Sequence, residues 1–155
     1  MLVEPPTRMA YIRHRGNLDE MINTFREVYT WAERDKNLVH KRTQWLLLIH
    51  DNPATTSGDM LWHSAGILLD ENIYNEITPE SEVSKMILPK GKYLCGQFTL
   101  IEGDIRNAWD AVCVQMIDHN IQSGDGYHFE RFQGPDPFSK TLQRIEIFVP
   151  IQNSP

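Results

Sequence analysis

The residues best suited to chemistry lie in an aromatic stretch, Y-H-F-E-R-F-Q, at positions 127–133. Successive side chains of a strand point to opposite faces, so this stretch would place His128, Glu130 and Phe132 together on one face. A glutamate among rings is either solvated on an exposed face or buried, and a buried one has a raised pKa or lies beside a cation or a donor. Because such groups concentrate at functional sites, Glu130 is the first candidate for binding or catalysis.

A second carboxylate lies beside a ring in the stretch 143–151, Q-R-I-E-I-F-V-P-I. Its alternating isoleucines are expected in the core, whereas Glu146 and Phe148 on the other face either meet solvent or line a cleft. Aromatic faces attract flat and cationic organic molecules, and a carboxylate adds charge complementarity. Rings pack in a core more often than they line a pocket, and both interpretations stay open for Tyr11, Trp45, Trp62, Phe98, Trp109 and Phe132.

Other kinds of site find no support in the sequence. The six histidines are scattered without an H-E-x-x-H motif, and Cys95 and Cys113 lack zinc-finger spacing, so neither a metal nor a cofactor is expected. The basic cluster R-H-R at 13–15 is too short for a nucleic-acid patch, and the net charge of −6 opposes a phosphate-binding surface. We therefore expect no direct contact with nucleic acid.

Composition and the N-terminus indicate a compartment. No apolar run approaches the ~20 residues that a membrane span needs, and the first residues, M-L-V-E-P-P-T-R-M, lack the pattern of a signal peptide. Cys95 and Cys113 are too few for a disulfide framework and are predicted to be free, buried hydrophobes. A hydrophobic share of 41% is enough for a real core. These features predict a cytoplasmic protein of one domain, residues 1–155, without membrane contact.

Two amphipathic helices are predicted, one in each half of the chain. Residues 18–32 and 105–117 carry apolar side chains at the i, i+3, i+4 spacing of a helix with one buried face. Asn17 would cap the first helix, with Glu20 completing a capping box, and Asp104 would cap the second.

Strand-like runs flank both helices in the same order, which predicts a tandem repeat of strand, helix, strand and strand. The repeats cover residues 6–77 and 84–152, and the equivalent glycines Gly16 and Gly103 lie 87 positions apart. Two such modules can pair into one antiparallel sheet of about eight strands with both main helices on one face. The expected fold class is therefore α+β, with a central cleft between the helices, where ligands commonly bind.

Four motifs, taken in order, resemble the gyrase-inhibitor-like (GyrI-like) family, which includes the effector-binding domain of multidrug-responsive bacterial transcription activators. They are A-Y-I-R-H-R-G-N-L, L-P-K-G-K-Y-L-C-G-Q-F, F-E-R-F-Q-G-P-D-P and I-E-I-F-V-P-I, and together they span nearly the whole chain. The resemblance implies two fused modules around a central cleft, in which family members bind lipophilic, often cationic compounds.

The resemblance also implies particular pocket residues. The family's buried glutamate falls on Glu130, within F-E-R-F. A second glutamate and an aromatic residue two positions later fall on Glu146 and Phe148, where the family often has tyrosine, so the ring is kept and the hydroxyl is lost. Phe98 and Tyr11 lie in strands that commonly lend rings to the pocket. The full ligand-binding set that we predict is Glu130, Glu146, Phe148, Phe98, Phe132, Tyr11, Trp109 and Trp62.

Three roles exist in the family, and the residues leave them open. The first is binding of a small hydrophobic or cationic ligand, by a domain that stands alone or is fused to a DNA-binding domain. The second is hydrolysis of reactive cyclopropane-bearing compounds, in which Glu130 would act as the general base. The third is interaction with DNA gyrase. Ligand binding in transcription regulation or drug response is our main hypothesis, with no catalytic residue unless Glu130 is one.

Overall fold

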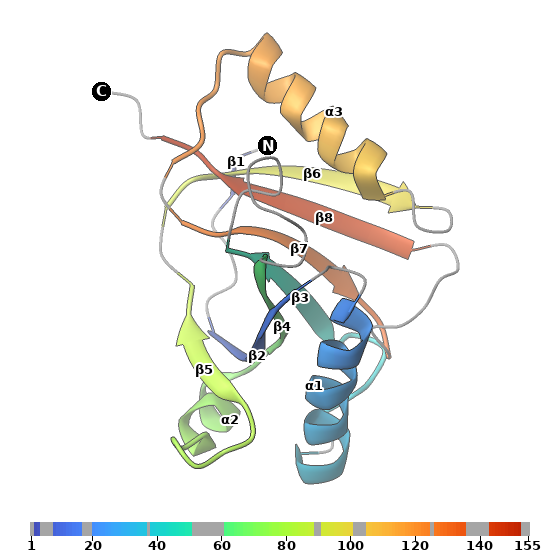
Figure 1. Cartoon of the computed structure of the whole chain (residues 1–155), viewed down its shortest axis with the longest axis vertical. Helices are drawn as coiled ribbons and strands as arrows, with labels where there is room; N and C mark the ends of the chain where they lie inside the picture. Colours follow the sequence, from blue (N-terminus) through green and yellow to red (C-terminus); the bar gives the residue numbers. More distant parts are fainter. Residues whose placement is uncertain are drawn as a thin grey trace.

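The computed structural model describes residues 2–3, 8–16, 20–36, 38–50, 61–88, 91–100, 105–124, 126–135 and 143–152. Its elements in chain order are β1 (Leu2–Val3), β2 (Arg8–Arg15), α1 (Met21–Lys36), β3 (Gln44–Ile49), β4 (Trp62–Leu68), α2 (Glu71–Glu76), β5 (Ser84–Ile87), β6 (Tyr93–Leu100), α3 (Ile105–Asp118), β7 (His128–Gln133) and β8 (Gln143–Pro150). Figure 1 shows one twisted sheet with α1 and α3 beside its two halves.

The described strands form one eight-stranded antiparallel sheet in the order β1-β6-β8-β7-β3-β4-β2-β5. This order is symmetric about the β7–β3 pair, so each strand of one repeat has a counterpart in the other. Strand β1 precedes the first repeat and pairs with β6 of the second, whereas β5 begins the second repeat and pairs with β2 of the first. The two repeats therefore interlock at both edges of the sheet, and the predicted α+β fold with about eight strands is confirmed.

The sheet has two distinct faces, which the strand register defines. Leu47, Glu130 and Ile147 are direct Cα partners across β3, β7 and β8, so their side chains share one face. Leu47 packs in a cluster with α1, and Ile147 packs in a cluster with α3. Both long helices therefore cover this face, which we call the helix face. Neighbouring residues along each strand, such as Leu48 and Phe129, point to the opposite face.

Helix α1 covers the part of the helix face formed by the first repeat. Phe25, Val28 and Ala32 are buried, and their spacing places them on one stripe of the helix. They pack against strand residues that include Trp45 and Leu47. Burying a ring as completely as Phe25, which is 1% exposed, contributes about 1.5–3 kcal/mol.

Helix α3 covers the part formed by the second repeat. Ala108, Val112 and Met116 recur every four residues, so they form one stripe, and all three are buried. They pack against Ile145 and Ile147 of β8, together with Val149 and partly buried neighbours.

A third cluster forms a core on the opposite face. Phe129 of β7 stacks on Phe148 of β8, with ring centroids 4.5 Å apart and ring planes 11° from parallel. This separation lies within the range of about 4.5–7 Å at which aromatic rings attract one another. The cluster draws on strands from both repeats, and its fully buried members are Met9, Leu46, Leu48, Leu88, Tyr93, Phe129 and Phe148.

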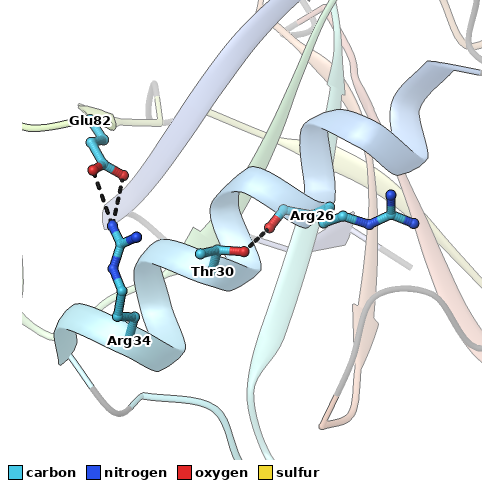
Figure 2. A network of polar contacts seen from close by, with 4 residues as sticks. All are labelled: Arg26, Thr30, Arg34 and Glu82. Atoms are coloured by element: carbon cyan, nitrogen blue, oxygen red, sulfur yellow. Dashed lines mark hydrogen bonds and ion pairs between the residues drawn. The ribbon is translucent and has the colours of Figure 1, made fainter.

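Local contacts fix the junction between the repeats. Asp70 caps the short helix α2, because its carboxylate accepts a hydrogen bond from the backbone N–H of Ile73 at 2.9 Å. Arg34 of α1 donates to both carboxylate oxygens of Glu82, at 3.1 and 3.3 Å, just before β5 (Figure 2). Both side chains are more than half exposed, so this pair contributes about 0–1 kcal/mol and serves mainly to orient the junction.

The predicted elements compare closely with the observed ones. The runs expected as strands became β2, β3, β4, β6, β7 and β8, and the two predicted helices became α1 and α3. The sequence analysis missed α2 and the edge strands β1 and β5, which are short. Both predicted caps, Asn17 and Asp104, lie outside the described residues. Glu20 accepts a hydrogen bond from His14 at 2.8 Å.

Two smaller findings complete the comparison. The prediction that both cysteines are buried is wrong for Cys113, because its position on α3 turns it away from the sheet and it is exposed. Cys95 is half-buried, and both thiols are free. Among the described helices, none has the length and the apolar character required to cross a bilayer.

Candidate functional site

Strand β7 lies at the centre of the molecule, where the two repeats meet. Its neighbours are β8, which lies under α3, and β3, which lies under α1. Figure 1 shows the two long helices on either side of this line. The helix-face residues of β7 are His128, Glu130 and Phe132, and the register confirms the alternation that the sequence predicts.

Glu130 is buried on the helix face, with 8% of its surface exposed. The indole N–H of Trp109, on α3, donates a hydrogen bond to its Oε2 at 2.8 Å. Burial raises the pKa of Glu130 from 4.5 to about 7, and the hydrogen bond from Trp109 offsets part of that rise. The carboxyl is therefore divided between its charged and neutral forms near neutral pH.

Apolar groups surround this carboxyl. Its direct partners across the sheet are Leu47 and Ile147, both buried. Phe132, two residues along β7, is 7% exposed and meets Phe25 of α1 edge-on, with ring centroids 5.5 Å apart. Trp109 thus contacts β7 from one helix and Phe25 contacts it from the other.

Phe98 joins the same face from β6. A Cβ added at Gly96 would lie 2.7 Å from the ring of Phe98, closer than such atoms approach, and a tight 3.1 Å from Val112 of α3. The missing side chain at Gly96 therefore leaves the room in which the Phe98 ring lies beneath α3.

The histidine on the same face of β7 does not supply a positive charge. His128 lies two residues before Glu130, and its ring centroid is 6.5 Å from that of Trp109. Burial lowers the pKa of His128 below 6.5, so the imidazole is mainly neutral at pH 7. Glu130 consequently has a hydrogen-bond donor but no cation from this neighbour.

Two predicted members of the set lie on the opposite face. Glu146 pairs with Arg131, whose Nε donates to Oε1 at 2.8 Å. It also accepts a weak hydrogen bond from the Cys95 thiol, with a donor–acceptor distance of 3.6 Å. Phe148 is 1% exposed and stacks on Phe129 in the core. The structure separates both residues from Glu130 because Ile147, not Phe148, is the partner of Glu130.

Tyr11 and Trp62 also lie on that opposite face. Tyr11 packs beside the core cluster of this face. The guanidinium of Arg13 lies 4.4 Å from the centroid of the Trp62 ring and that of Arg15 lies 5.4 Å away, so cations cover this indole. The structure thus brings together Glu130, Trp109, Phe132 and Phe98, and it does not bring Tyr11 or Trp62 to them.

The comparison with known families agrees with this architecture. Residues 1–152 match the family described as GyrI-like small molecule binding domain. The chain belongs to this family.

Solved structures support the assignment of the fold. The C-terminal domain of EcmrR is 12% identical, with a TM-score of 0.73 over 99% of this chain and 97% of that one. SAV2435, solved with tetraphenylphosphonium, is 11% identical, with a TM-score of 0.62 over 99% and 93%. A hydrolase from Listeria innocua is 10% identical, with a TM-score of 0.56 over 98% and 90%. A search of curated proteins finds no match.

Two features of the GyrI-like domain lay beyond the sequence analysis. Phe25 was visible only as one apolar position of a helical stripe, and nothing in that stripe indicated contact with Phe132. Gly96, an isolated glycine within a strand, was the available signal for a close approach of side chains. In the part of the chain that the structure describes, no three His, Cys, Asp or Glu side chains gather closely enough to hold a metal ion.

Proposed function

We propose that this GyrI-like domain binds a lipophilic cation on the helix face, with Glu130 as the counter-charge, as an effector-binding domain in transcription regulation or drug response. The observation that carries the proposal is the burial of Glu130 among apolar groups, with the Trp109 indole as its hydrogen-bond donor. A neighbour of the same fold was solved with tetraphenylphosphonium, a compound of this class.

The electrostatics favour a cation over a neutral ligand. Burial holds the pKa of Glu130 near 7, which means that the charged carboxylate lacks compensation. A cation beside it would supply that compensation and lower the pKa, so binding would release a proton in the pH range around 7. The rings of Phe132 and Phe98 offer faces that attract cations and stack on flat compounds.

Binding requires Trp109 to give way. The indole N–H is bonded to Oε2 of Glu130, so a ligand that pairs with this oxygen must displace the indole. Breaking the hydrogen bond from Trp109 to the charged carboxylate would cost about 1.5–3 kcal/mol. The ion pair between Glu130 and the ligand would offset this cost. Trp109 therefore acts as a plug that closes the site when no ligand is bound.

The test is fluorescence titration with a rhodamine dye, and competition by tetraphenylphosphonium, on wild type and Glu130→Gln. We expect the E130Q variant to bind the cation about tenfold or more weakly, because the amide carries no charge. Glu80→Gln, on an exposed turn, is the matched control and should bind like wild type. Equal affinity of wild type and E130Q would contradict the role of the carboxylate.

A second function is favoured by the same pKa. A carboxyl that titrates near 7 is suited to general-base catalysis, in which Glu130 would take a proton from water as the water attacks an electrophilic carbon. Incubation with an electrophilic cyclopropane-bearing compound, followed by mass spectrometry, tests this activity. A product heavier by one water that wild type forms and E130Q does not would support hydrolysis.

A further inference from the structure

A hollow of about 930 Å³ lies at one end of four neighbouring strands, β6, β8, β7 and β3, and Glu130 does not line it. It is formed where β3 and β8 begin and where β6 and β7 end. Phe98 and Phe132 of the proposed cation site reach it, whereas Glu130 and Trp109 do not line it. Its volume lies within the range of small-molecule sites.

The register shows which face of the sheet supplies the polar side chains of this hollow. Gln97, Glu146 and Arg131 are direct partners across β6, β8 and β7, and they share the face opposite to Glu130. Thr99 pairs with Arg144 one step further along the strands on the same face. The polar lining therefore belongs to a different side of the sheet from the proposed cation site.

The charge of the hollow is positive in a chain whose net charge is −6. Among the described residues that line it, Arg131, Lys41 and Arg144 are basic and Glu146 alone is acidic. Arg131 is committed to Glu146, and this half-buried pair is further held because the guanidinium lies 5.0 Å from the Phe148 ring centroid. Among the residues that the structure describes, Lys41 and Arg144 have no carboxylate partner.

We propose that this hollow is a second binding site, which takes a small polar organic anion. Lys41 and Arg144 would hold its carboxylate or phosphate group, since both side chains are cationic donors and the guanidinium fork matches planar and tetrahedral oxyanions. The lining also holds the amides of Gln44, Gln97 and Gln133, which can hydrogen-bond a polar body. Because Arg131 is already paired with Glu146, the anion meets the two remaining cations.

The test is isothermal titration calorimetry with citrate and with glucose 6-phosphate, using glucose as the neutral control. Wild type should bind at least one of the two anions saturably and glucose not at all, and added salt should weaken the binding. The preferred anion identifies carboxylate or phosphate as the recognised group. No saturable binding of either anion to wild type would overturn the proposal.

Matched double variants locate the site. Lys41→Gln with Arg144→Gln should lose about tenfold or more in anion affinity, since two charge-assisted contacts are removed. Arg42→Gln with Lys92→Gln changes the net charge equally at exposed positions outside the hollow and should bind like wild type. Equal losses in the two double variants would contradict the assignment. E130Q should bind the anion like wild type. The anion titration therefore tests this site even if the proposed cation site is wrong.

Discussion

Glu130 shows how one buried residue links stability to pH. Its pKa in the folded chain is about 7, against 4.5 for the unfolded value, so the folded state holds its proton more tightly. This tighter proton binding stabilises the folded state fully below about pH 4.5, and the contribution is lost as the pH rises through 7. The shift corresponds to about 3 kcal/mol between these limits.

We predict that Glu130→Gln removes this dependence. In urea unfolding, raising the pH from 4.5 to 8 should lower the free energy of unfolding by about 3 kcal/mol more in wild type than in the variant. The difference between the two proteins isolates Glu130 from other titrating groups. Parallel curves for wild type and variant over this range would show that the carboxyl is not held neutral by burial.

His63 is the second residue with a pH signature. It is fully buried on β4, and neither ring nitrogen has a hydrogen-bond partner among the described residues. Burial, with the neighbouring His14 and His50, lowers the pKa of His63 to about 4. As the pH is lowered, His63 is protonated in the unfolded chain at a higher pH than in the folded chain. The folded state therefore loses stability as the pH falls below 6.5.

We predict that His63→Leu stabilises the fold at pH 7 by about 1 kcal/mol, because it removes buried polar atoms without partners at similar volume. The gain should grow as the pH is lowered from 6.5. Chemical denaturation at pH 7 and pH 5 measures both effects. A loss of stability at both pH values would mean that the imidazole has a favourable role in the core.

Sequence alternation determined much of the site at this scale. It correctly placed His128, Glu130 and Phe132 on one face, because strand geometry alone fixes that pattern. It could not decide which face of β8 meets Glu130, since that depends on the register of two strands joined through a turn. A one-residue difference in register exchanges Ile147 and Phe148, so the grouping of Glu146 with Glu130 needed the structure.

At the scale of elements, α3 controls access to Glu130. The apolar stripe of α3 packs on β8 and β6, and Trp109 is the position from which the helix reaches across to β7. Periodicity predicted the helix and its buried side. The partner of the indole N–H was not predictable, because it depends on how the helix crosses the sheet.

We predict that Trp109→Ala speeds the association of a cationic dye, since no indole must leave before the dye reaches Glu130. Stopped-flow fluorescence measures the association rate of wild type and variant. Trp62→Ala, on the opposite face, is the control for loss of an indole and should associate at the wild-type rate. An unchanged or slower rate in W109A would argue against a plug.

At the scale of the whole molecule, the interlocked edges join the two repeats. The tandem repeat was visible in the sequence because helices and central strands recur with the same spacing. The exchange of β1 and β5 was not, because these strands are short and their pairing depends on contacts far apart in the chain. The central β3–β7 pair, six residue partners long, also joins the repeats.

We therefore predict that the halves do not fold alone. Residues 1–80 would lack β5 on one edge and β7 on the other, leaving β3 as an exposed apolar edge strand that favours aggregation. Circular dichroism and gel filtration of each half, and of the two halves co-expressed, test this expectation. A monomeric, cooperatively unfolding half would contradict it.

The most direct test of the account is the pKa of Glu130 itself, followed through the side-chain carboxyl carbon by isotope-edited NMR. The central claim is that a buried carboxyl awaits a cation. We predict a pKa near 7 in the free protein, falling to 4.5 or below when tetraphenylphosphonium is bound. A pKa near 4.5 in the free protein, or one that the bound cation leaves unchanged, would contradict the claim.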